Sequence, residues 1–172
     1  MSRTADAVAL VTSLVAPGAR VLDAGCGDGE LTVALTDAGF VALGLDKDLD
    51  AIRPVSVDRP KIPFFLDDLT SLDLPMGVVG RGFDAVVLKD VVAGMSLGEI
   101  DAALAGCARV AAPDAVLVAT VPTGSVGTFV RAGAKSRWSQ TSRADWDDEQ
   151  VVVVLGLDPE KKPSRLRSLL GR

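Results

Sequence analysis

The stretch VLDAGCGDGE, residues 21–30, decides the fold. It joins the end of an apolar strand to the start of a helix through three glycines at alternate positions, Gly25, Gly27 and Gly29. Glycine lets the backbone turn sharply and lie close to a ligand, and the amides at a helix start favour a negative group. The spacing G-x-G-x-G has no Lys-Ser or Lys-Thr after it, which excludes a P-loop. A dinucleotide site would place its third glycine one residue later.

Short β-rich runs alternate with helix-like stretches along the chain, which predicts a parallel sheet with helices on its faces. Ser96 followed by Glu99 is the best helix start, because each side chain can satisfy an orphan amide at the other residue. Pro54 is expected to end the short helix that begins near Leu49. The expected strands are 20–24, 41–45, 62–66, 83–88, 115–121 and 151–157, with a further one near 139–142, and the expected helices are 30–38, 49–53, 96–111 and 126–135.

The length of 172 residues fits a single domain. We expect an amphipathic N-terminal helix within residues 1–19, a core over 20–157 and a basic tail over 158–172. The longest apolar runs are far shorter than the roughly 20 residues that cross a bilayer. Two cysteines in a chain of this size do not indicate a disulfide framework. These features predict a soluble, cytoplasmic protein with no membrane partner.

The composition excludes several kinds of chemistry. The chain has no His, which rules out Ser-His-Asp and Cys-His mechanisms and any imidazole-bound metal. Cys26 and Cys107 cannot build a structural zinc site alone, so any metal would have to be a carboxylate-bound ion, and no metal site is assigned. Residues 1–120 carry 9 basic against 17 acidic side chains, a net −8, and residues 121–172 carry 9 against 6, a net +3. An acidic main body disfavours nucleic acid as a partner, because binding phosphates needs a concentrated cationic face.

Carboxylates follow three successive strands, at ends that a parallel sheet brings to one edge. Asp23 ends the first strand, Asp46 ends the second in GLDKD, and Asp67 and Asp68 follow the third in FFLDDLTSLDLP. Two ribose hydroxyls can donate to one carboxylate, which makes Asp46 a ribose clamp by position. An acid after the third strand could accept from an adenine amino group. Each acid alone could simply end a strand or cap a helix, but together they predict a ligand site.

Taken in order, these segments resemble the class I S-adenosylmethionine-dependent methyltransferases. VLDAGCGDGE resembles their first motif, GLDKD the acidic end of their second strand, and DDLTSLDLP their third-strand motif. FDAVVLKDVV and ARVAAPDAVLVATVP are similar to their fourth strand and to the helix and fifth strand that follow. The resemblance covers roughly residues 18–122. It implies an α/β fold, a Rossmann-like doubly wound and mostly parallel sheet in a three-layer sandwich with an antiparallel last strand. It also implies S-adenosylmethionine as cofactor and S-adenosylhomocysteine as product.

The resemblance further implies roles for individual residues. The glycine loop and Asp23 would hold the methionine end of the cofactor, and Asp46 would hold the ribose. Asp68 would bind the adenine, with the backbone of Leu69 beside the ring. The cofactor-binding residues expected are Asp23, Gly25, Cys26, Gly27, Gly29, Asp46, Lys47, Asp68, Leu69 and Lys89, the last of these near the methyl group.

Asp90, directly after the fourth strand, is the candidate catalytic base. A carboxylate must be desolvated to remove a proton near neutral pH, and the alternative is a solvated loop acid or a local cap. Further along the chain, Trp138 and Trp146 could wall an acceptor pocket or cover the edge of the sheet.

Two functions remain open from the sequence. The first is a methyltransferase that acts on a small-molecule O, N or carboxylate acceptor. The second is an S-adenosylmethionine-binding regulatory or partner subunit, because GCGDGEL also resembles the first motif of the MetW proteins, which are associated with homoserine acylation. Few residues lie outside the core motifs to bind an acceptor. A protein partner or a second copy of the chain could therefore complete the site.

Overall fold

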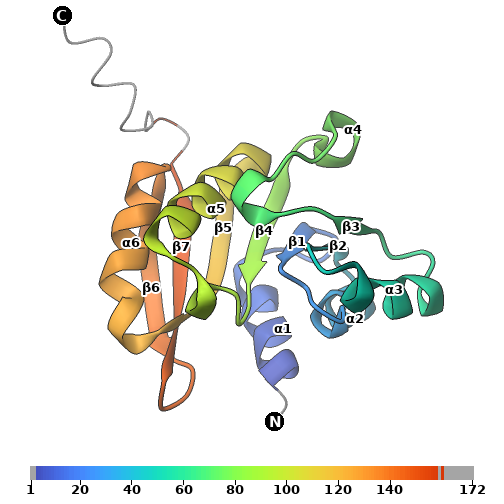
Figure 1. Ribbon diagram of the computed structural model, residues 1–172, viewed down its shortest axis with the longest axis horizontal. Coiled ribbons are helices and arrows are strands. Elements are labelled where there is room, and N and C mark those ends of the chain that lie inside the picture. Colours follow the sequence, from blue (N-terminus) through green and yellow to red (C-terminus); the bar gives the residue numbers. More distant parts are fainter. Residues whose placement is uncertain (1–2, 159, 161–172) are drawn as a thin grey trace, which may run out of the picture.

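The fold is seen in a computed structural model that describes residues 3–158 and 160. Its centre is a seven-stranded sheet with the strand order β3-β2-β1-β4-β5-β7-β6 (Figure 1). The strands are β1 (Arg20–Ala24), β2 (Val41–Asp46), β3 (Phe64–Leu66), β4 (Phe83–Leu88), β5 (Ala111–Pro122), β6 (Trp138–Asp145) and β7 (Gln150–Leu157).

The strand directions confirm the predicted fold class. Strands β1 to β5 pair in parallel, whereas β7 runs antiparallel to β5, and β6 antiparallel to β7. β1 lies between β2 and β4, so the chain adds β2 and β3 on one side of β1 and then adds β4 and β5 on its other side. In doubly wound sheets such a switch point leaves a crevice at the carboxyl ends of the strands, where ligands bind.

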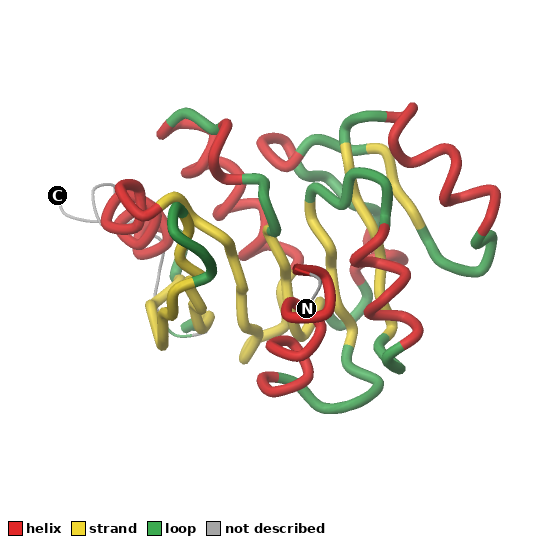
Figure 2. The backbone as a smooth tube through the Cα atoms, turned by 90° about the horizontal axis from the view of Figure 1, so that it is seen from below, coloured by secondary structure: helices red, strands yellow, loops and turns green. Residues whose placement is uncertain are grey.

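Helices cover both faces of the sheet and make the three layers (Figure 2). Buried residues of α1 and α2 pack with one face, and those of α5 and α6 pack with the other. The helices are α1 (Arg3–Leu14), α2 (Glu30–Asp37), α3 (Leu49–Asp58), α4 (Met76–Val79), α5 (Leu97–Val110) and α6 (Val126–Lys135), with short 3-10 turns η1 (Leu69–Ser71), η2 (Val92–Gly94) and η3 (Thr123–Ser125).

The fourth strand shows why the sheet is buried on both sides. Side chains alternate along a strand, so Val86 and Leu88 join the cluster under α5 and α6. Ala85 and Val87 join the cluster under α1 and α2. Both pairs are at most 2% exposed, and each buried Val or Leu side chain stabilises the fold by about 1.5–3 kcal/mol. An apolar run without alternation is therefore what a central parallel strand requires.

The start of α5 confirms the predicted helix cap. Ser96 Oγ accepts from the amide of Glu99 at 3.4 Å, and Glu99 Oε2 accepts from the amide of Ser96 at 2.8 Å. The two bonds satisfy donors that the helix leaves unpaired, which fixes where the preceding loop must end.

The prediction that Pro54 ends its helix is wrong, because α3 continues to Asp58. Proline lacks one helical N–H, but its fixed φ suits a helix, and the bonds around it form. The amide of Ile52 donates to Asp48 at 3.2 Å, and that of Arg59 donates to Val55 at 2.8 Å. Strand bounds differ by more than one residue in three places: β3 begins at Phe64, β5 begins at Ala111, and the strand expected near 139–142 is β6, eight residues long.

Trp138 belongs to the core and not to an acceptor pocket. Its side chain is fully buried, and its Nε1 donates to the carbonyl of Leu104 at 3.0 Å. Trp146 packs on the opposite face of the sheet, against the buried cluster of Val118, Val152 and Val154 on β5 and β7. Both tryptophans therefore cover the sheet, Trp138 from the edge strand β6 itself.

The basic tail expected over residues 158–172 lies, apart from residues 158 and 160, outside the described residues. Within residues 3–158 and 160, no helix has the length and apolar character needed to cross a membrane.

Candidate functional site

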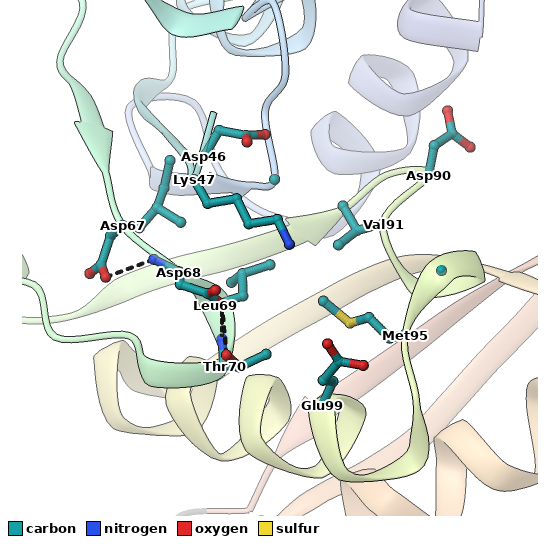
Figure 3. Close-up of a pocket in the computed structure, with 13 residues that line it drawn as sticks. Asp46, Lys47, Asp67, Asp68, Leu69, Thr70, Asp90, Val91, Met95 and Glu99 are labelled. Carbon is teal, nitrogen blue, oxygen red and sulfur yellow. Dashed lines mark hydrogen bonds between the residues drawn. The ribbon is translucent and has the colours of Figure 1, made fainter. Parts of the chain in front are cut away.

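A pocket of about 290 Å³ opens at the carboxyl edge of the sheet, beside the end of β1 (Figure 3). Loops that follow four parallel strands meet there, so residues distant in sequence share one wall. The lining residues are Gly25, Leu45, Asp46, Lys47, Asp67, Asp68, Leu69, Thr70, Asp90, Val91, Gly94, Met95 and Glu99. The structure thus brings together six of the predicted site residues: Gly25, Asp46, Lys47, Asp68, Leu69 and Asp90.

The glycine loop is shaped by backbone that only glycine adopts readily. Gly25 has φ +84°, and a Cβ placed on it would lie 2.5 Å from Cγ2 of Val91. Gly29 has φ +77°, and its Cβ would lie 2.8 Å from the ring of Phe64. Any larger residue at either position would push the loop away from its neighbours. The alternate glycines therefore pack the loop tightly between β3 and the loop after β4.

Asp46 ties the glycine loop to the end of β2. Its Oδ2 accepts from the amide of Gly27 at 2.7 Å, and its Oδ1 accepts from the amide of Asp48 at 3.0 Å. A carboxylate has about four acceptor positions, so two remain for donors in the pocket. The side chain is thus held by the backbone on both sides and still presents acceptors to a ligand with two hydroxyls.

The two neighbouring acids after β3 differ in what they already bind. Asp67 uses both oxygens within the loop, accepting from the amides of Asp68 at 2.8 Å and Asp73 at 3.0 Å. Asp68 uses Oδ1 alone, for the amide and the hydroxyl of Thr70, both at 2.8 Å (Figure 3). These bonds, with the charge of Lys47, lower the pKa of Asp68 and keep it ionised. Asp68 is therefore the one of the pair with an oxygen that makes no bond within the loop.

Six lining residues were not predicted to belong to the site: Leu45, Thr70, Val91, Gly94, Met95 and Glu99. Val91 and Met95 add apolar surface opposite Leu69 (Figure 3). Glu99 was predicted only as a helix cap. The position of the loop in the sequence could have indicated those that follow β4. A loop that leads from the fourth parallel strand to a capped helix must cross the same edge of the sheet.

Asp23 does not line the pocket. It is 2% exposed and accepts from the hydroxyl of Thr32 on α2 at 2.6 Å. Burial raises the pKa of Asp23 to about 6, against the lowering effects of the Thr32 hydrogen bond and the charge of Lys89. It lies in the core beneath the glycine loop and could act on a ligand only through its charge.

Three loop residues predicted to bind the cofactor, Cys26, Gly27 and Gly29, are also absent from the pocket lining. The amide of Gly27 is occupied by Asp46, as described above. Burial, followed by the nearby charge of Asp23, raises the pKa of the Cys26 thiol to about 12. Cys26 therefore stays a neutral thiol, and its part in the site is to fit a tight turn.

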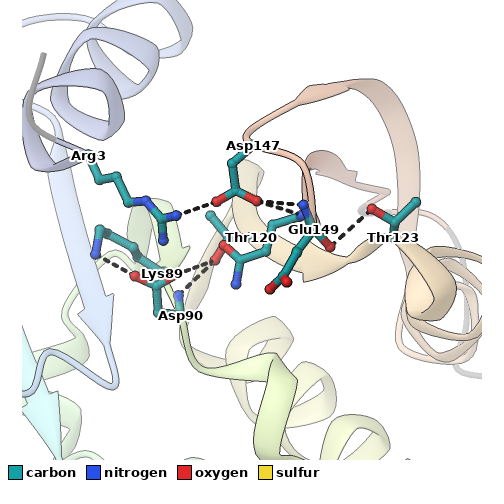
Figure 4. Close-up of polar contacts among 8 residues, drawn as sticks. Arg3, Lys89, Asp90, Thr120, Thr123, Asp147 and Glu149 are labelled. Carbon is teal, nitrogen blue, oxygen red and sulfur yellow. Dashed lines mark hydrogen bonds and ion pairs between the residues drawn. The ribbon is translucent and has the colours of Figure 1, made fainter.

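Lys89 and Asp90 form an ion pair at the end of β4, with Lys89 Nζ 2.6 Å from Asp90 Oδ2 (Figure 4). Lys89 also lines a small apolar gap beside Trp146, and not the main pocket. Burial would raise the pKa of Asp90, but the hydrogen bond and charge of Lys89, with a bond from Thr120, lower it overall. A catalytic base near neutral pH needs the opposite shift, so the environment of Asp90 does not suit that predicted role.

The described residues contain no group of three or more Cys, Asp or Glu placed to hold a metal ion. The pocket nevertheless carries five carboxyl groups, Asp46, Asp67, Asp68, Asp90 and Glu99, against the single amine of Lys47. Such a lining favours an organic ligand that carries positive charge and several hydrogen-bond donors.

Known proteins match more than half of this chain in sequence. The sequence model of the family described as "Methyltransferase domain" matches residues 21–114. An uncharacterized methyltransferase from Synechocystis sp. (strain ATCC 27184 / PCC 6803 / Kazusa) is 29% identical over 102 residues. That match takes in 59% of this chain and 46% of the relative, so the chain spans about half the length of this curated protein.

Solved structures of methyltransferases share the fold. A TehB-like SAM-dependent methyltransferase from Corynebacterium glutamicum superposes with a TM-score of 0.74 at 24% identity, over 88% of this chain and 86% of the other. The magnesium protoporphyrin IX methyltransferase of Synechocystis, with bound SAM, gives 0.74 at 20% identity, over 90% and 78%. An amino pentose methyltransferase from Micromonospora echinaspora, also with bound SAM, gives 0.74 at 17% identity, over 91% and 92%.

Proposed function

Because this chain belongs to the methyltransferase domain family, we propose that it transfers a methyl group from S-adenosylmethionine to a small-molecule O, N or carboxylate acceptor and releases S-adenosylhomocysteine. The observation that carries the proposal is the position of Asp46, whose carboxylate is fixed by two backbone amides and faces the pocket beside the glycine loop. A ribose presents two adjacent hydroxyl donors, which match the two acceptor positions that remain.

The rest of the pocket fits the same ligand. Asp68 has an oxygen left to accept from the adenine amino group, and Leu69, Val91 and Met95 offer apolar surface for the ring. Gly25 leaves room for the chain beyond the ribose, because any side chain there would meet Val91. The sulfonium and ammonium of S-adenosylmethionine suit a lining with five carboxyl groups and one amine.

When bound, S-adenosylmethionine supplies a methyl group that its sulfonium has already activated. The residues of the chain then have to hold the acceptor in line with that methyl group and exclude water. Asp90, directly after β4, lines the pocket together with Gly25, and Lys89 forms an ion pair with it. The lowered pKa of Asp90 keeps it a carboxylate, so we assign it a role in positioning the acceptor and in supplying negative charge. We further propose that the acceptor is a nucleophile that needs no strong base to remove its proton.

The other function considered from the sequence, a MetW-like regulatory or partner subunit, draws no support from a particular residue of the pocket. That resemblance stays a prediction, as do a homodimer, a protein partner and a cytoplasmic location. A small-molecule acceptor also stays a proposal. Family neighbours such as the Burkholderia thailandensis N1-methyltransferase, solved with bound 1,6-didemethyltoxoflavin and S-adenosylhomocysteine, support it by example.

Calorimetric titration of the purified chain with S-adenosylhomocysteine and S-adenosylmethionine tests the proposal. We expect both to bind with a one-to-one stoichiometry. Asp50→Asn, which changes an exposed carboxylate on α3 outside the pocket, serves as the matched control and should bind as the wild type does. Absence of binding at millimolar ligand would overturn the proposal. Transfer of a labelled methyl group from S-adenosylmethionine to members of a small-molecule panel would then separate an enzyme from a binding subunit.

A further inference from the structure

The turn after β4 contains a backbone conformation that needs an explanation. Asp90 has φ +59°, in the left-handed region that residues other than glycine adopt uncommonly. The preceding strand pairs in register with β5 from Ala85 to Leu88, and Val91 after the turn returns to φ −99°. A single left-handed residue therefore reverses the chain between β4 and η2, at the end of the pocket next to the glycine loop.

The hydroxyl of Thr120 holds this residue in place. Thr120 is 3% exposed on β5, and its Oγ1 accepts from the backbone amide of Asp90 at 2.7 Å (Figure 4). The same Oγ1 lies 3.3 Å from Oδ1 of Asp90, to which it donates. Thr120 thus makes both hydrogen bonds to Asp90, and the bond from the amide fixes the backbone of Asp90 itself. By contrast, the Lys89–Asp90 ion pair joins side chains that are 22% and 39% exposed, so it cannot set the peptide orientation.

The conformation of Asp90 decides where Val91 lies. Val91 Cγ2 comes within 2.5 Å of the position that a Cβ of Gly25 would occupy, so it touches the glycine loop directly. Val91 and Gly25 both line the pocket, whereas Thr120 does not. A different φ at Asp90 would swing Val91 off the loop and open that end of the pocket.

We propose that Thr120 is a positioning residue of the cofactor pocket, which acts by holding Asp90 in the left-handed conformation that seats Val91 against Gly25. The inference rests on the proposed function for the identity of the ligand. Thr120 itself contributes only hydrogen bonds through its hydroxyl. Valine has nearly the same shape and suits a strand equally well, but it lacks that hydroxyl.

Two substitutions at Asp90 test the backbone part of the proposal. Asp90→Gly and Asp90→Val both remove the carboxylate with its bonds to Lys89 and Thr120, but glycine adopts a left-handed φ freely and valine does not. We expect Asp90→Val to bind S-adenosylhomocysteine about 10-fold or more weakly than Asp90→Gly does, from the cost of the left-handed conformation. Equal losses in the two variants would overturn the proposal. Because this side chain is partly exposed, neither change removes core packing.

Substitutions at Thr120 test the hydroxyl. Thr120→Ser keeps it and should bind as the wild type does, whereas Thr120→Val removes it and should weaken binding about 10-fold. Thr36→Val is the matched control, because Thr36 Oγ1 donates only to the carbonyl of Thr32 within α2. It should leave the affinity unchanged. If Thr120→Val binds as tightly as the wild type, the proposal is wrong, and if it fails to fold, the two Asp90 variants still decide.

A measurement without ligand separates this inference from the proposed function. In the unliganded protein, a nuclear Overhauser effect between the Val91 methyls and the Gly25 α-protons should appear in the wild type, Thr120→Ser and Asp90→Gly. It should be lost in Thr120→Val and Asp90→Val. Persistence in both of the latter would overturn the inference even if binding is normal. Failure of the wild type to bind S-adenosylhomocysteine, with these signals as expected, would instead overturn the proposed function alone.

Discussion

Asp46→Ala is the change that tests the proposed site most directly. In the wild type, this carboxylate accepts from the amides of Gly27 at 2.7 Å and Asp48 at 3.0 Å, which leaves two acceptor positions for ribose hydroxyls. One hydrogen bond to a charged group contributes about 1.5–3 kcal/mol. Losing the clamp should therefore weaken S-adenosylhomocysteine binding by roughly 10- to 150-fold, at about 1.4 kcal/mol for each factor of ten.

The assay is calorimetric titration of the wild type, Asp46→Ala and Asp50→Asn at the same pH and ionic strength. Asp46 also holds the glycine loop through Gly27, so a thermal melt of each variant must show that the variant is folded at the temperature of the titration. Asp50→Asn reports what removing a nearby charge does by itself. Unchanged affinity in folded Asp46→Ala, with normal binding by the wild type, would refute the assignment of this carboxylate to the ribose.

Three other predictions concern buried groups and the glycine loop. Burial raises the pKa of Asp23 to about 6, so its contribution to stability is full below about pH 4 and is lost as the pH rises through 6. Asn cannot ionise, so the free energy of unfolding of Asp23→Asn relative to the wild type should rise by about 2 kcal/mol between pH 4.5 and pH 7.5 in urea denaturation. A difference between the two proteins that does not change with pH would contradict this. Gly25→Ala and Gly39→Ala both place a side chain at positive φ, but only the first meets a neighbour, Val91 at 2.5 Å. Gly39→Ala should lower the free energy of unfolding by about 1–2 kcal/mol without changing the affinity for S-adenosylhomocysteine. Gly25→Ala should lower the free energy of unfolding further and should also weaken binding. Equal effects of the two substitutions would mean that the contact with Val91 is absent. Burial raises the pKa of the Cys26 and Cys107 thiols to about 12. A thiol reagent at pH 8 should therefore label neither cysteine in the folded chain and both cysteines in urea. Rapid labelling of the folded chain would show that one of the thiols is exposed.

The fold could be predicted because its determinants are local. The glycine loop, the Ser96–Glu99 cap and the apolar run of β4 each specify their own segment, and the alternation of strands and helices predicts a parallel sheet with helices on its faces. The antiparallel last strand was implied by the resemblance to class I methyltransferases and not by any local pattern. Pro54 shows the limit of this reasoning. Its helix continues because the bonds on either side of the proline form, and a single residue type could not reveal that.

The site could be placed at one edge of the sheet but not resolved side chain by side chain. The sequence puts Asp23, Asp46, Asp67 and Asp68 at the carboxyl ends of neighbouring strands, where they are chemically alike. Their partners make them different: Asp23 is buried with Thr32, and Asp67 bonds amides of its own loop through both oxygens. Asp68 keeps one oxygen without a local bond, and Asp46 holds one amide on each oxygen, one of them in the glycine loop. Which oxygen remains available depends on neighbours brought together by the sheet, and no pattern along the chain carries that information.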